Sequence, residues 1–129
     1  MNIFWKIVGY GVLAVLAFDT TASFASVNFG FSYGYAIVGS VLIYAMVGYF
    51  VFRHRGFFSA IAAALLVEVV DATLGWYISW QIGPGALPAG QATIAVIATI
   101  IALAFFLAVV CAGIGSAIAR AVHGPRNNA

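Results

Sequence analysis

Four long apolar segments follow one another along this chain, with only short polar stretches between them. A helix needs about 20 apolar residues to cross the hydrocarbon core of a bilayer, and each segment reaches that length. We therefore predict an all-α integral membrane protein, a bundle of four transmembrane helices that forms a single domain over residues 1–129. The expected spans are residues 3–27, 33–52, 57–80 and 92–119, followed by a polar cytoplasmic tail at 120–129.

The composition leads to the same class of protein. Hydrophobic residues make up 65% of the chain and charged residues 6%, whereas soluble domains are typically about 25% charged. A water-soluble monomer could not bury so much apolar surface. The net charge of +2 comes from basic residues that flank the apolar segments, so we expect no nucleic-acid partner. The single cysteine, Cys111, excludes an internal disulfide.

The basic residues favour one orientation in the membrane. The five Lys and Arg residues all fall at the same end of a four-span zigzag: Lys6, Arg53, Arg55, Arg120 and Arg126. The loops at the other end, residues 28–32 and 81–91, carry no charge. The positive-inside rule then places both termini in the cytoplasm, and we expect a protein of the bacterial inner (plasma) membrane. Trp76, Tyr77 and Trp80 suit anchoring at the opposite interface.

The N-terminal segment also has the features of a signal peptide. Lys6 precedes an apolar stretch, and Ser23-Phe24-Ala25 before Ser26 forms a small-x-small cleavage pattern. The apolar run continues to Val27 and is long enough to span, which favours its retention as a helix. A mature protein beginning at Ser26 would lack the first helix and Asp19.

The third span carries two of the three acidic residues, Glu68 and Asp71. Read as one helix, residues 60–79 place these acids on a face of small residues. That face holds Ala60, Ala64, Ala72, Gly75 and Ser79, and the opposite face holds Leu66, Val69, Val70, Thr73 and Tyr77. The two acids cost about 5–7 kcal/mol on the insertion scale, and the apolar residues return about 3–6 kcal/mol. The helix therefore needs partners that shelter its acidic face.

Polar residues of the other spans fall at a similar depth, when counted from the span ends at about 1.5 Å per residue. Together they predict a polar layer between the midplane and the uncharged side of the membrane. The candidate proton- or cation-binding residues are Asp19, Glu68 and Asp71, and the supporting polar residues are Ser23, Ser40, Tyr44 and Thr99.

No Lys, Arg or His lies within a span to neutralise these acids. Three states are open: protonated, hydrogen-bonded to Ser, Thr or Tyr, or bound to an imported cation. Carboxyls at membrane depth are typical of proton relays and cation sites. We therefore expect proton- or cation-coupled transport or conduction. The alternative is a non-transporting membrane subunit or assembly protein, in which the acids serve as interhelical hydrogen-bond glue.

Signatures of enzymes are missing from the sequence. No nucleophile has a base beside it, and no histidine lies within a span, so we expect no catalytic residues, no cofactor and no metal site. Small-residue ridges predict close helix packing or an oligomer: Ala104, Ala108, Ala112 and Ser116 on the fourth span, and Ala36, Ser40 and Gly48 on the second. The expected partners are the lipid bilayer, further copies of this chain or a partner membrane subunit, and a proton or small cation as ligand.

Overall fold

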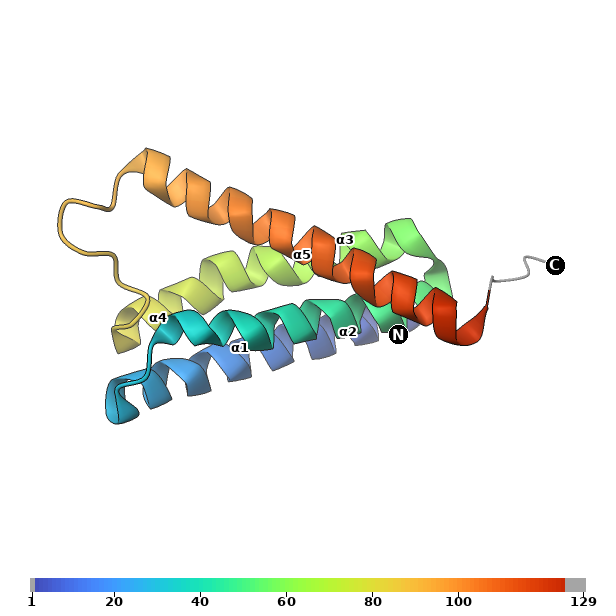
Figure 1. Cartoon of the computed structure of the whole chain (residues 1–129), viewed down its shortest axis with the longest axis horizontal. Helices are drawn as coiled ribbons and strands as arrows, with labels where there is room; N and C mark the ends of the chain where they lie inside the picture. Colours follow the sequence, from blue (N-terminus) through green and yellow to red (C-terminus); the bar gives the residue numbers. More distant parts are fainter. Residues whose placement is uncertain (1, 125–129) are drawn as a thin grey trace.

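The computed structural model describes residues 2–124, and within that range the chain forms helices and no strands. Four helical stretches are long and apolar enough to cross a membrane: Ile3–Phe29, Tyr33–Arg55, Phe57–Ile82 and Ile94–His123. They lie side by side as an elongated bundle (Figure 1). The predicted all-helical class with four candidate spans is thus confirmed; the first three spans begin at the predicted residues, and the other limits are shifted by two to four residues. Arg126 and the rest of the expected tail from residue 125 lie outside the described residues.

The first two spans are set by local signals at their ends. Helix α1 (Ile3–Phe29) begins where the Asn2 side chain accepts a hydrogen bond from the Phe4 N–H at 3.2 Å. It ends at Gly30, which takes a left-handed conformation that favours glycine. A short 3-10 helix, η1 (Tyr33–Ala36), then leads directly into α2 (Ile37–Arg55).

The third span is interrupted, although the sequence predicts one regular helix over residues 60–79. Helix α3 (Phe57–Val70) passes into a π-helical segment, η2 (Asp71–Gly75), and then into α4 (Trp76–Ile82). A π turn is rare and often occurs at functional sites, where side-chain contacts favour it over the regular helix. The predicted division into two faces nevertheless holds: Ala60, Ala64 and Glu68 are buried, whereas Leu66 and Val69 are exposed.

The fourth span, α5 (Ile94–His123), packs closely against α2 at one end of the bundle only. A Cβ atom at Gly48 would lie 2.5 Å from the Cα of Ala112, and one at Gly115 would overlap the carbonyl oxygen of Ala45. Backbones approach this closely only where glycine leaves room. The buried residues of α5 all lie from Ala108 onward, and its first half leans away from the bundle (Figure 1).

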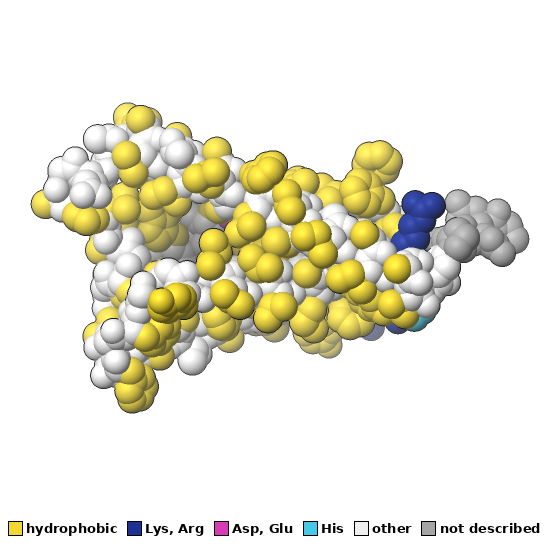
Figure 2. Space-filling view, in the orientation of Figure 1, with side chains coloured by type: hydrophobic (Ala, Val, Ile, Leu, Met, Phe, Trp, Pro, Cys, Tyr) yellow, Lys and Arg dark blue, Asp and Glu magenta, His cyan; other side chains and the backbone are white. Residues whose placement is uncertain are grey.

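The two ends of the bundle differ in charge. The charged end holds the turn between α2 and α3, with Arg53 and Arg55, and the end of α5, with Arg120. The uncharged end holds residues 30–32 and the loop of residues 83–93. Between the ends, large apolar side chains cover much of the visible surface (Figure 2). An apolar surface of this extent is typical of helices that face lipid.

Candidate functional site

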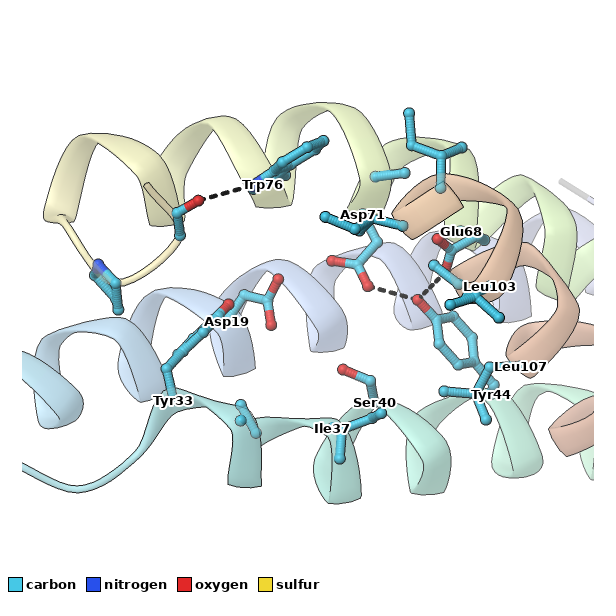
Figure 3. A pocket seen from close by; sticks show the side chains of 18 of the residues that line it. Asp19, Tyr33, Ile37, Ser40, Tyr44, Glu68, Asp71, Trp76, Leu103 and Leu107 are labelled. Atoms are coloured by element: carbon cyan, nitrogen blue, oxygen red, sulfur yellow. Dashed lines mark hydrogen bonds between the residues drawn. The ribbon is translucent and has the colours of Figure 1, made fainter. Parts of the chain in front are cut away.

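A cavity of about 520 Å³ lies where α5 leans away from the other helices. Its polar wall is formed by carboxyl and hydroxyl groups of α1, η1, α2, α3 and η2 (Figure 3). Its other wall is apolar and comes largely from the first half of α5, with Ile100, Leu103 and Leu107. The residues that carry polar groups into it are Asp19, Tyr33, Ser40, Tyr44, Glu68 and Asp71.

Tyr44 of α2 joins two of the acids. Its hydroxyl oxygen lies 2.5 Å from Glu68 Oε2 and 2.5 Å from Asp71 Oδ2. Tyr44 and Glu68 are each 2% exposed, so water does not compete freely for these bonds. A phenol has one proton and can donate to only one carboxylate at a time. Both hydrogen bonds exist together only if the second carboxyl is protonated and donates to the Tyr44 oxygen.

Asp19 of α1 lies beside Asp71, with Gly75 next to both. A Cβ atom at Gly75 would lie 2.5 Å from Asp71 Oδ1 and 3.0 Å from Asp19 Oδ2. The two carboxyl oxygens are therefore at most 5.5 Å apart, which is the sum of these distances. Asp71 Oδ1 is buried and has no hydrogen-bond partner among the described residues. A buried acceptor without a donor is costly, and a proton or a cation held between the two carboxyls would satisfy it.

The other neighbour of Asp19 is Tyr33, at the start of η1. The Tyr33 side chain extends toward Asp19, and both residues line the cavity (Figure 3). Asp19 is only 8% exposed. The carboxyls and phenols therefore form one row of oxygen atoms along the cavity wall, from Tyr33 through Asp19, Asp71 and Tyr44 to Glu68.

The π-helical segment determines which residues share this wall. In η2 the Trp76 N–H donates to the Asp71 carbonyl, a step of five residues instead of four. At 3.6 residues per turn, residues five apart would lie on different faces of a regular helix. The wider turn allows both Asp71 and Trp76 to line the same cavity.

The loop of residues 83–93 closes the cavity at the uncharged end. Trp76 Nε1 donates to the Gly85 carbonyl oxygen at 3.0 Å, and the Gly85 N–H donates to the Ser79 carbonyl at 3.2 Å. A side chain at Gly85 would collide with Ser79, so this close approach requires glycine. Pro84 and Leu87 of the same loop also face the cavity.

The structure does not bring all of the predicted polar layer to this site. Ser40 lines the cavity, but Ser23 lies apart from it and donates to Ser79 Oγ at 3.1 Å, which joins α1 to α4. Thr99 does not line the cavity either. Thr99 is exposed, and its hydroxyl donates to the Ala95 carbonyl of its own helix at 2.8 Å. Depth along a helix does not fix the direction in which a residue faces, and α5 turns Thr99 away from the cavity.

Two cavity residues with polar side-chain atoms, Tyr33 and Trp76, are not among the predicted site residues. Tyr33 stands at the end of a span, and its long side chain extends toward Asp19 along the cavity wall. Trp76 was expected to anchor at the interface, whereas it lines the cavity and holds the loop. The signal that could have found Trp76 is its spacing from Asp71, but it becomes informative only once the π turn is known.

The acids form a row and do not converge on one point. Within residues 2–124, no three side chains of His, Cys, Asp or Glu gather closely enough to hold a metal ion. Comparison of the chain with protein-family models, curated proteins and solved structures found no match. The function is therefore inferred from the site itself.

Proposed function

We propose that this protein is a small transporter or channel of the bacterial inner membrane that moves a substrate or ion coupled to protons or cations. The observation that carries the proposal is the row of oxygen atoms from Asp19 to Glu68 along the wall of the cavity. Acidic residues at membrane depth are costly and usually mark the path of an ion or a proton.

The row has the connections that a proton relay needs. When Glu68 donates to the Tyr44 oxygen, the Tyr44 proton can pass to Asp71, and the net result is one proton moved from Glu68 to Asp71. From Asp71 the nearest acceptor is Asp19, at most 5.5 Å away as derived above. A cation held between Asp19 and Asp71 would take the place of a proton there, which provides a means of coupling.

The proposed orientation places the charged end in the cytoplasm and the cavity toward the opposite side. Cysteine introduced separately at Gly90 and at Arg55 tests this arrangement, because the native Cys111 is buried. A membrane-impermeant thiol reagent added outside intact cells should label the first variant and not the second. Equal labelling of both variants would contradict the proposed arrangement of four spans.

The decisive experiment measures flux in liposomes that contain the purified protein. Glu68→Gln and Asp71→Asn keep the shape of the side chains and their hydrogen-bonding capacity, but an amide cannot release or take up a proton in this range. We expect each variant to fold normally and to lose at least about tenfold of the pH-driven or cation-driven flux, a change equivalent to about 1.4 kcal/mol. Thr99→Val is the matched control, since it removes a polar group of a span that faces away from the cavity.

A second candidate function remains, because Tyr44 links α2 to both α3 and η2. Hydrogen bonds of this kind are also expected in a non-transporting subunit, where they would only stabilise the packing of the helices. Wild-type liposomes without flux driven by protons, Na⁺, K⁺ or divalent cations, together with amide variants of unchanged stability, would remove the transport proposal and leave this one.

A further inference from the structure

We infer that the cavity binds an amphipathic organic cation, a compound with an amine or quaternary ammonium group and an apolar body. The inference rests on the proposed function, because it names the substrate class of the same site. Three features of the cavity carry it: its size, the division of its walls, and the side on which it is open.

The size argues for a molecule rather than a bare ion. The cavity has a volume of about 520 Å³, and pockets for small organic ligands occupy roughly 300–1,000 Å³. A metal ion needs several converging ligands, whereas these acids lie in a row, and no three metal-binding side chains in residues 2–124 gather closely enough to hold one. A cavity of this volume can hold a small organic molecule.

The two walls of the cavity differ in polarity and charge. One side presents Asp19, Asp71 and Glu68, including the buried Asp71 Oδ1 that lacks a donor. The facing side presents Ile100, Leu103 and other apolar side chains of α5. Among residues 2–124, no Lys, Arg or His lines the cavity, so an anion would meet only negative or neutral groups of this part of the chain. A cationic head against the acids and an apolar body against α5 satisfies both walls.

Aromatic rings also line the cavity, together with the acids that would bind the cationic group. Trp76, Tyr33 and Tyr44 all line the cavity, and the faces of such rings attract ammonium groups with an energy that is largest for Trp. A quaternary ammonium ion cannot donate hydrogen bonds and is recognised by negative charge and by aromatic rings, and both kinds of group line this cavity.

The cavity is open on its side, between α5 and α2. Helix α5 packs against α2 and α3 but has no comparable packing against α1, η2 or α4 in the described part of the chain. The space-filling view shows the resulting hollow near the uncharged end (Figure 2). In the proposed orientation this opening faces the lipid of the outer leaflet, where an amphipathic cation accumulates.

Equilibrium dialysis of protein in lipid nanodiscs against labelled benzyltrimethylammonium tests the inference, with empty nanodiscs to correct for partitioning. Neopentylbenzene is the matched neutral probe, since a carbon replaces the charged nitrogen in the same shape. Saturable binding of the cation, at least about tenfold tighter than that of the neutral probe, supports the inference. Equal binding of the two probes, or binding of neither, overturns it.

Two variants test whether the cation binds in this cavity. Ala104→Phe fills the cavity from the α5 wall, and Ala102→Phe adds the same ring to the exposed side of the same helix. We expect the first to weaken binding of the cation at least about tenfold and the second to leave it within about twofold. Equal effects of the two variants would overturn the assignment to this cavity.

The outcomes separate this inference from the proposed function. Proton flux in liposomes without saturable binding of benzyltrimethylammonium would overturn the inference and leave proton conduction standing. Saturable binding that Ala104→Phe weakens, without any flux, would support the inference and remove transport.

Discussion

The two halves of the bundle use the same helices in opposite ways. Toward the charged end, α2 and α5 touch backbone to backbone at Gly48 and Gly115. Toward the uncharged end, the same two helices part and enclose a cavity of about 520 Å³ lined with acids. The tight half fixes the crossing of α5, and that crossing holds the other half open.

The difference follows from the size of the side chains on α5. Glycine, alanine and serine face α2 in the tight half, whereas Ile100, Leu103 and Leu107 face the cavity in the open half. In lipid, helices associate mainly through close packing and hydrogen bonds, because the surrounding chains are as apolar as the helices. In the open half the polar row joins α2 to α3 and η2, whereas α5 contributes apolar side chains to the cavity wall, which makes this half suited to accept a ligand.

The largest expected effect comes from disturbing the tight half. Gly115→Ala introduces a Cβ that overlaps the Ala45 carbonyl oxygen, and neither backbone can move without separating α2 from α5. We expect a loss of about 1–3 kcal/mol in the free energy of unfolding, the usual cost of overpacking. Thermal or denaturant unfolding in detergent micelles measures it.

Gly113→Ala is the control on the same helix, because a Cβ there has no atom of the described chain within 4 Å. It should leave the stability unchanged or raise it slightly, since alanine favours the helix. Equal destabilisation by the two substitutions would show that the contact between Gly115 and Ala45 does not hold the bundle together.

A smaller effect is expected from the polar row of the open half. Tyr44→Phe keeps the ring and removes the hydroxyl that bonds Glu68 and Asp71, so two buried carboxyl oxygens lose their partner. Unsatisfied buried groups cost about 1–3 kcal/mol, but hydrogen bonds measured in membranes average about 0.6 and reach about 1.7 kcal/mol. With two bonds lost, we expect about 1–2 kcal/mol in the free energy of unfolding, together with loss of flux.

The control is Tyr77→Phe, which removes the hydroxyl of a tyrosine that is 61% exposed. It should change neither the free energy of unfolding nor the flux. Tyr44→Phe protein with full flux would show that protons do not pass through this hydroxyl, whatever the change in stability.

The sequence predicts the spans and the buried face of the third one because both depend on properties that add along the chain. Apolar length decides where a span begins and ends, and the spacing of Glu68 from Ala60 and Ala64 decides which face must be sheltered. The same reasoning identified Asp19 and Tyr44 by their depth. These residues do lie together with Glu68 and Asp71 along the cavity.

Rotation and local distortion could not be predicted in this way. Depth says nothing of which direction a residue faces, so Thr99 was placed in the layer although α5 turns it outward. The π turn at Asp71–Gly75 lies where Asp71 bonds Tyr44 of α2 and Gly75 lies next to Asp19 of α1, and no spacing within one segment indicates it. Trp76 faces the cavity only because of that turn, and for this reason its position was missed.

The smallest expected effect tests a hydrogen bond between α1 and α4 in the open half, which lies apart from the cavity. Ser23 Oγ of α1 donates to Ser79 Oγ of α4 at 3.1 Å, and both residues are buried. Ser23→Ala removes one neutral hydrogen bond between helices, so we expect a loss of about 0.6 kcal/mol in the free energy of unfolding. Thr99→Ala is its control, because that hydroxyl bonds within its own helix and its removal breaks no contact between helices. If Ser23→Ala costs as much as Gly115→Ala, the open half is as firmly packed as the tight half, and the contrast between them is wrong.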